Sequence, residues 1–164
     1  MKQKVFSWRD SFTIRDEEDQ DLYTVKGEIF TLGRKLHIYD MSGNEIALIK
    51  QKLLTLLPKY IVSGENFDPF TISQKLSVLV PNYSVEPMGW SVKGSITGHE
   101  FSLYSGSDIV ASVSKAWISW GDSYEINIHN TENHMQALAI VLAIDCMRAD
   151  ADDAAIGAPG FNTG

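Results

Sequence analysis

The sequence predicts a mainly β protein: a closed antiparallel β-barrel of about twelve strands around a central hydrophobic C-terminal α-helix. Three observations lead to this prediction. Short segments of alternating apolar and polar residues recur along the chain, and two halves of that pattern resemble each other. One long apolar run, "MQALAIVLAIDCM" at residues 135–147, follows the strands.

The alternating segments are short and evenly spaced. They are rich in β-branched and aromatic residues and are separated by turn-forming residues such as Asp40-Met41-Ser42-Gly43-Asn44. A dozen such strands with short connections favour a meander that closes on itself. The predicted strands are Lys4–Ser7, Ser11–Arg15, Leu22–Phe30, Lys35–Asp40, Glu45–Gln51, Lys59–Ser63, Phe70–Leu76, Asn82–Val85, Gly89–Gly94, His99–Tyr104, Ile109–Lys115 and Tyr124–His129.

An internal repeat relates the two halves of the strand pattern. Val-Lys-Gly at 25–27 recurs at 92–94, Tyr39 corresponds to Tyr104, and Ala47 and Tyr60 recur 64 positions later as Ala111 and Tyr124. In the second copy Val110, Ser112 and Ser114 alternate with Ala111, Val113 and Lys115, and the serines belong outside. We therefore expect Ala111 and Val113, and likewise Ala47 and Ile49, to face inward, where small residues leave room for a central element.

The apolar run predicts a buried helix over about residues 134–149. Asn133 is the expected N-cap, with Gln136 completing a capping box. The run is shorter than the roughly 20 residues that a membrane span needs, and it has no polar face for a surface helix. The centre of the barrel remains, with Asp145 at one mouth, either paired with Arg148 or on a frayed, solvated helix end.

The composition is that of one ordinary globular domain. Of 164 residues, 44% are hydrophobic and 21% charged. We expect a single domain over residues 1–150 and a flexible tail over 151–164, where "ADDAAIGAPGFNTG" is rich in alanine, glycine and acids.

Charge and cysteine content exclude several classes of function. The net charge of −7 argues against a general nucleic-acid binder, which needs a basic surface, and the single Cys146 excludes an intrachain disulfide. The beginning "MKQKVFSWRD" lacks the apolar stretch of a secretory signal. We expect a cytoplasmic protein that is not transmembrane, with the membrane periphery as a second location.

Several segments carry the resemblance to a known family. "FTIRDEEDQDLYTVKGEIFTLGRKLHIYDMSGNEIALIKQKLL", "WSVKGSITGHEFSLYSGSDIVASVSK", "WGDSYEINI" and "LAIVLAID" stand in the order found in the LURP-one-related family, which the chain resembles to about Asp150. The resemblance implies a tubby C-terminal-like fold, a twelve-stranded barrel around a central helix that is related to tubby domains and phospholipid scramblases. The resemblance implies no catalytic residues. The family's usual acidic turn contains a glycine, whereas "DEEDQD" at residues 16–21 has none, which bears on how tight that turn is.

No local motif indicates catalysis, a metal or another cofactor. His129 and His134 have metal-like spacing, but His37, His99 and the single cysteine supply no zinc set. The five carboxylates of "DEEDQD" do not fit a calcium loop, and we interpret them as a solvated hairpin tip.

One surface feature stands out: the segment "KQKLLTLLPKY" at residues 50–60. Lys50, Lys52 and Lys59 flank four leucines in a locally basic stretch, whereas the chain from Gly121 onward is acidic. Lysines beside exposed leucines suit a lipid interface, so these three lysines are the candidate ligand-binding residues. The alternative is that the leucines cap the barrel end and the lysines are ordinary solvated charges on an edge strand.

Two function classes, and a third less favoured, follow. The first is a non-enzymatic binding or scaffold domain of the LURP-one-related type whose partner is a phosphoinositide, another anionic lipid headgroup or a membrane surface. The second is a protein–protein adaptor that uses an outer barrel face or the acidic C-terminal surface. An unrecognised enzyme, which would need a deep pocket with a perturbed titratable residue, is third.

Overall fold

The computed structural model describes residues 2–5, 11–28, 32–77, 82–115 and 124–156. They form twelve strands, a short 3₁₀ helix η1 (Thr131–Asn133) and one α-helix, α1 (His134–Ile156). The strands are β1 (Lys2–Val5), β2 (Ser11–Arg15), β3 (Asp21–Glu28), β4 (Lys35–Tyr39), β5 (Glu45–Gln51), β6 (Lys59–Gly64), β7 (Phe67–Lys75), β8 (Asn82–Glu86), β9 (Trp90–Ser95), β10 (Glu100–Ser105), β11 (Asp108–Lys115) and β12 (Tyr124–Ile128).

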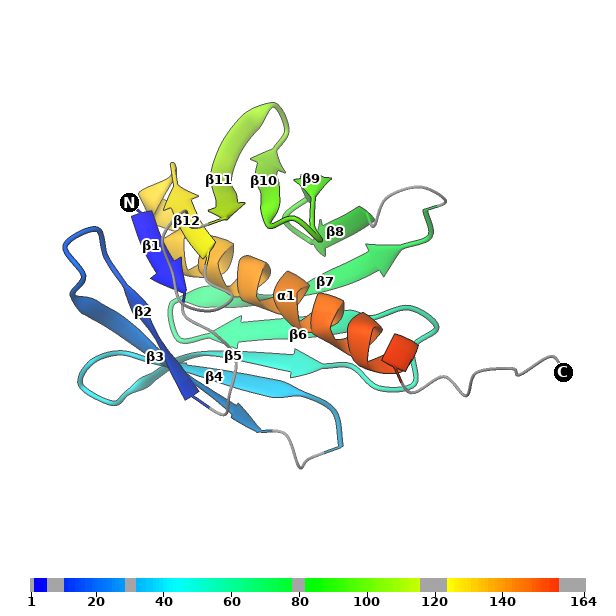
Figure 1. Ribbon diagram of the computed structural model, residues 1–164, viewed down its shortest axis with the longest axis horizontal. Helices are drawn as coiled ribbons and strands as arrows, with labels where there is room; N and C mark the ends of the chain where they lie inside the picture. Colours follow the sequence, from blue (N-terminus) through cyan, green and yellow to red (C-terminus); the bar gives the residue numbers. More distant parts are fainter. Residues whose placement is uncertain (1, 6–10, 29–31, 78–81, 116–123, 157–164) are drawn as a thin grey trace, which may run out of the picture.

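Each strand pairs antiparallel with its neighbour in sequence. The first strand, β1, pairs with both β2 and β12, so the ladder returns to its starting point. The prediction of a mainly β, antiparallel fold with one C-terminal helix is confirmed. Figure 1 shows α1, in orange to red, running through the middle of the molecule with strands on both sides.

The helix forms the centre of the core. Residues 137–147 are all buried, and only Asp145 among them is polar. The inward residues of the strands alternate with outward ones and pack against this helix, as with Ala47 and Ile49 on β5 and Ala111 and Val113 on β11. The expected inward positions are therefore confirmed, and the all-round apolar helix is buried because it is surrounded by sheet.

Both ends of the helix differ from the prediction. Asn133, the expected N-cap, is the last residue of the turn η1, which runs directly into α1, and Asn130 caps that turn by accepting a hydrogen bond from the Glu132 N–H. The helix also continues to Ile156, through six residues that were expected to belong to the tail. Alanines and the ion pair of Arg148 with Asp152, one turn apart, favour this extension.

Matching details confirm the internal repeat. Lys26 lies over the ring of Tyr39 at 5.0 Å, and the equivalent Lys93 lies over Tyr104 at 4.8 Å. A β-bulge occurs at the same point of the β4–β5 and β10–β11 pairings. The prediction for Val110 is wrong: its alternation with Ser112 placed it outside, but Val110 is buried. The second bulge explains the difference, because a bulge puts two successive residues opposite one partner and so breaks the alternation.

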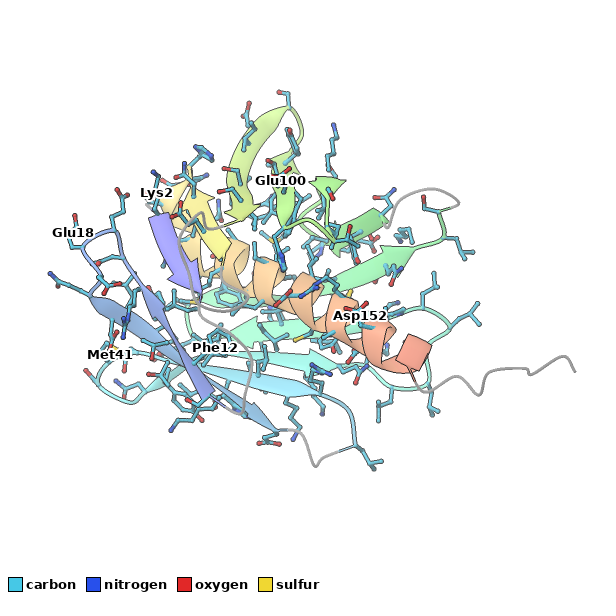
Figure 2. The ribbon with its side chains drawn as sticks, viewed as in Figure 1. Lys2, Phe12, Glu18, Met41, Glu100 and Asp152 are labelled. Carbon is cyan, nitrogen blue, oxygen red and sulfur yellow. The ribbon has the colours of Figure 1, made fainter. Side chains whose placement is uncertain are left out.

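The acidic hairpin tip lies at the β2–β3 turn. The Asp16 carboxylate accepts hydrogen bonds from the backbone N–H groups of Glu18 and Gln20, and Glu17 to Asp21 are exposed. Figure 2 shows Glu18 at the outer end of this hairpin. Asp19 takes the left-handed conformation, with φ of 64°, that a glycine would adopt without strain. The turn is therefore tight without a glycine, and the solvated-tip interpretation is confirmed.

Replacing Asp19 with glycine should stabilise the protein by about 0.5 kcal/mol. Glycine removes the strain of the left-handed conformation, and this gain exceeds the opposing effect of the larger conformational entropy that glycine gives the unfolded chain. Urea unfolding should show a higher midpoint with an unchanged slope. The control is Glu18→Gly, at a neighbouring exposed position without positive φ, which should be slightly destabilising. A lower midpoint for Asp19→Gly would contradict the strain argument.

Candidate functional site

The three predicted lysines lie on the outward face of one hairpin. Lys50 is exposed on β5, between Lys35 of β4 and Ile61 of β6 in the register. The backbone N–H of Lys52 donates to the carbonyl of Lys59 at 2.8 Å, so these two residues stand opposite each other. Because Gln51 and Tyr60 point inward, Lys52 and Lys59 point outward beside Lys50. The structure thus brings all three candidate residues together.

The leucines of the same segment do not all cap the barrel. Leu54 and Leu56 are at least 95% exposed, whereas Leu53 is 44% exposed and Leu57 is half-buried. The strand β5 pairs with β4 and β6, so it is not an edge strand. The capping explanation therefore fails for Leu54 and Leu56, because both project into solvent on the loop between Lys52 and Lys59.

A neighbouring turn adds to this surface. Leu32, before β4, is 89% exposed, and a Cβ atom on the next residue, Gly33, would lie 3.0 Å from the Leu53 side chain. The β3–β4 and β5–β6 connections are thus adjacent at the end of the molecule where α1 finishes (Figure 1). We call the six residues of this surface the lysine–leucine rim: Leu32, Lys50, Lys52, Leu54, Leu56 and Lys59.

Acidic side chains near the rim are paired with other groups. The Asp150 carboxylate contacts Arg34 Nε at 3.0 Å, and Asp152, labelled near the helix end in Figure 2, contacts Arg148 at 3.8 Å. Among the residues that the structure describes, no carboxylate forms an ion pair with a lysine of the rim. These lysines therefore stay available to an external anion.

Beneath the rim, Asp150 joins three strand ends to the helix. Its Oδ2 accepts hydrogen bonds from the Tyr60 hydroxyl at 2.7 Å and from Gln51 Nε2 at 3.0 Å, while Oδ1 faces Arg34. Burial raises the pKa of Tyr60, and the hydrogen bond and negative charge of Asp150 raise it further. Tyr60 thus remains a protonated donor at neutral pH. Sequence reasoning missed this cluster because its members come from distant parts of the chain; Gln51 and Asp150, for example, are 99 positions apart.

A second polar cluster surrounds Asp145. This residue is 4% exposed and lies inside α1 rather than at its end, so the frayed-end alternative is wrong. Its Oδ1 contacts Arg148 Nε and His99 Nε2, both at 3.2 Å. The Arg148 pairing is confirmed, and His99, on the β9–β10 turn, is the partner that sequence reasoning did not supply. The two contacts compensate the burial of this carboxylate.

The opposite end of the molecule, where α1 begins, has a pocket of about 340 Å³. Its walls come from the start of β7 with the residue before it, the β8–β9 connection and the first turn of α1: Asn66, Phe67, Asp68, Pro69, Phe70, Pro87, Met88 and Gln136. This volume is at the lower limit of small-molecule sites, and the lining is mostly apolar. Asp68 is the one ionisable residue in the lining of this pocket, so the lining offers no pair of groups for acid–base chemistry.

The two histidines with metal-like spacing each contact another group. His129 Nε2 is 3.1 Å from the Ser112 hydroxyl, whereas the His134 ring packs against Tyr23. Within the described part of the chain, no three His, Cys, Asp or Glu side chains converge as a metal site would require. Nor does any described helix have the length and apolar character to cross a membrane.

Comparison with known proteins identifies the relatives of this chain. It is 35% identical, over 156 residues, to the uncharacterized protein YxjI of Bacillus subtilis (strain 168), covering 95% of this chain and 96% of that protein. An X-ray structure of a protein from Arabidopsis thaliana has a similar fold, with a TM-score of 0.62 and 19% identity over 88% of this chain and 90% of the other. The profile of the LURP-one-related family matches residues 1–145. On this match and on the fold described above, the chain belongs to the LURP-one-related family.

Proposed function

We propose that the protein is a non-enzymatic domain that binds anionic phospholipid surfaces through the lysine–leucine rim. The observation that carries this proposal is the placement of two fully exposed leucines, Leu54 and Leu56, between outward-facing lysines at one end of the barrel. We take the ring of strands around its buried helix to be a closed barrel of the tubby C-terminal type, and the partner's anionic headgroups to include phosphoinositides.

The chemistry of the rim matches a lipid interface. A leucine that moves from water into the acyl region contributes roughly 1.5–3 kcal/mol when fully buried. A lysine near an anionic membrane contributes about 1 kcal/mol. Two leucines and three lysines can therefore support reversible binding in spite of the overall charge of −7, because screening confines charge effects to about 10 Å.

Like charges within the rim also favour an anionic partner. Lys52 and Lys59 stand directly opposite each other, an arrangement that is destabilising in a sheet unless a counter-charge is nearby. Lys35, opposite Lys50, differs because its ammonium contacts Glu28 at 2.8 Å. An anionic headgroup would supply for Lys52 and Lys59 the counter-charge that Glu28 supplies for Lys35.

A protein–protein adaptor is the second candidate function. The apolar pocket beside Phe67, Phe70 and Met88 favours it, because such a pocket can receive an apolar side chain of a partner. This pocket lies at the opposite end of the barrel from the rim, so the two candidate functions can be tested separately.

Vesicle sedimentation tests the proposal with charge-matched variants. We expect the wild-type protein to bind vesicles containing anionic lipid, and not neutral ones, with affinity that falls as salt rises. The double variant Lys52→Glu with Lys59→Glu should bind at least 30-fold more weakly, since losing about 1 kcal/mol per lysine gives that factor. Leu54→Ser with Leu56→Ser should also bind at least tenfold more weakly.

The control is Lys26→Glu with Lys93→Glu, which changes the net charge equally at two exposed lysines outside the rim. It should bind almost as well as wild type. If the wild-type protein sediments with no vesicle of any composition, or if this control loses as much affinity as the rim variant, the proposal is wrong. Phosphoinositide vesicles, compared with phosphatidylserine vesicles of equal charge, distinguish a specific headgroup from general anionic attraction.

A further inference from the structure

The rim loop and the end of the central helix are connected through one carboxylate. The loop leaves the sheet after Gln51 and returns just before Tyr60, and both side chains donate to Oδ2 of Asp150 on α1. Asp150 therefore holds the two ends of the loop together from inside the barrel. The hydrogen bond of Lys52 to Lys59 closes the loop directly above this point.

The same carboxylate fixes the neighbouring turn. Oδ1 of Asp150 contacts Arg34 Nε, while the backbone N–H of Arg34 donates to Gln51 Oε1 at 2.9 Å and the Gln51 N–H donates to the Arg34 carbonyl at 2.9 Å. Gly33, next to Arg34, packs beside Leu53. Asp150 thus positions both connections that carry rim residues, Leu32 on one and Leu54 and Leu56 on the other.

The loop needs such support, because its own conformation is strained. Leu54 has φ of 57°, a left-handed conformation that a leucine rarely adopts, and within the loop the Thr55 hydroxyl donates to the Lys52 carbonyl. Residues held in sparsely populated conformations persist when surrounding contacts determine them. Here the determining contacts run through the base of the loop to Asp150 and to Gln74, whose N–H donates to the Pro58 carbonyl.

We infer that Asp150 is a positioning residue for lipid binding, and that the C-terminal turns of α1 and the occupancy of the rim regulate each other. This inference rests on the proposed function. Its physical basis is preorganisation: if only part of the population holds the loop in the binding conformation, the apparent dissociation constant rises by the inverse of that fraction. Coupling between two sites is reciprocal, so lipid binding must also stabilise the end of the helix.

The test compares two conservative substitutions that lie two positions apart on the helix. Asp150→Asn keeps the shape of the side chain but removes the charge that faces Arg34 and replaces one acceptor oxygen with a donor group. Asp152→Asn makes the same change at an exposed carboxylate that contacts only Arg148 among the described ion pairs. Tyr60→Phe removes one donor from the cluster and leaves Asp150 in place, as a second variant that folds if Asp150→Asn does not.

The expected result is a loss of affinity in the folded protein. At a temperature where each variant is fully folded, Asp150→Asn should bind anionic vesicles about tenfold more weakly, Tyr60→Phe severalfold more weakly and Asp152→Asn like wild type. The salt dependence should be unchanged, because the rim lysines are still present. A residue with only a structural role would lower the melting temperature without changing the affinity of the folded state.

Amide hydrogen exchange provides a readout that does not depend on lipid. In Asp150→Asn the amides of Gln51 and Lys52 should exchange faster than in wild type, with no change in Asp152→Asn. Adding anionic vesicles to wild type should slow exchange over residues 148–156. Unchanged loop exchange together with wild-type affinity in Asp150→Asn overturns the inference and leaves the proposed function standing. If wild type does not bind vesicles at all, the proposed function fails, and loop exchange alone decides whether Asp150 holds the loop.

Discussion

Replacing Ala143 with aspartate should prevent stable folding. Ala143 is fully buried in the middle of α1, inside the ring of strands. An isolated buried carboxylate costs several kcal/mol even after the structure relaxes, which is comparable with the whole stability of a domain. We expect the variant to lack a cooperative thermal transition by circular dichroism, or to melt at least 15 °C below wild type.

The matched control for this variant is Ala151→Asp, on the same helix but exposed. It should melt within about 3 °C of wild type, because a solvated carboxylate carries little penalty. Asp145 shows what a carboxylate needs at a buried position, since it contacts both His99 and Arg148. If Ala143→Asp melts like the control, α1 is not the centre of the core.

Replacing Gly94 with alanine should destabilise the protein by about 3 kcal/mol. Gly94 has φ of 124°, and a Cβ atom there would lie 2.5 Å from the Glu100 carbonyl oxygen and 2.7 Å from the Phe101 Cα. Both obstacles are backbone atoms of the paired strand β10, so the clash cannot be relieved by rotating a side chain. A loss of about 3 kcal/mol from strain and clash together corresponds to a fall of roughly 6–12 °C in melting temperature for a domain of this size.

The internal repeat supplies the control for Gly94. Gly27 occupies the equivalent position in the first Val-Lys-Gly sequence, but its φ is not positive and a Cβ atom would make an ordinary 3.5 Å contact with Leu36. Gly27→Ala should therefore change stability by no more than about 0.5–1 kcal/mol, in either direction. Equal effects of the two substitutions would mean that the two copies use their glycines in the same way, contrary to the structure.

Local periodicity predicted the main features of this fold. Alternation along β5 and β11 identified their inward residues because side chains on a strand change face at every residue. The length and uniform apolarity of residues 137–144 placed the helix in the core, because no other environment suits a short helix without a polar face. Lys50, Lys52 and Lys59 were predicted as candidate residues because they flank the leucines of one short basic segment.

Tertiary structure decided what local patterns cannot specify. A bulge in the pairing of β10 with β11 buried Val110, because the face of a residue depends on how its strand pairs with the next one. Sequence alone also gave no sign that Leu54 and Leu56 would be almost fully exposed while Leu57 is half-buried.

The partners of the helix carboxylates depended on the fold in the same way. Asp150 meets Tyr60 across 90 positions and Asp145 meets His99 across 46. The sequence by itself determined which residues are buried, because the period of apolar residues along each segment identifies its buried face. Only the packing of the strands around the helix determined which polar groups pair with each other, because a hydrogen bond requires donor and acceptor positions that distant strands set jointly.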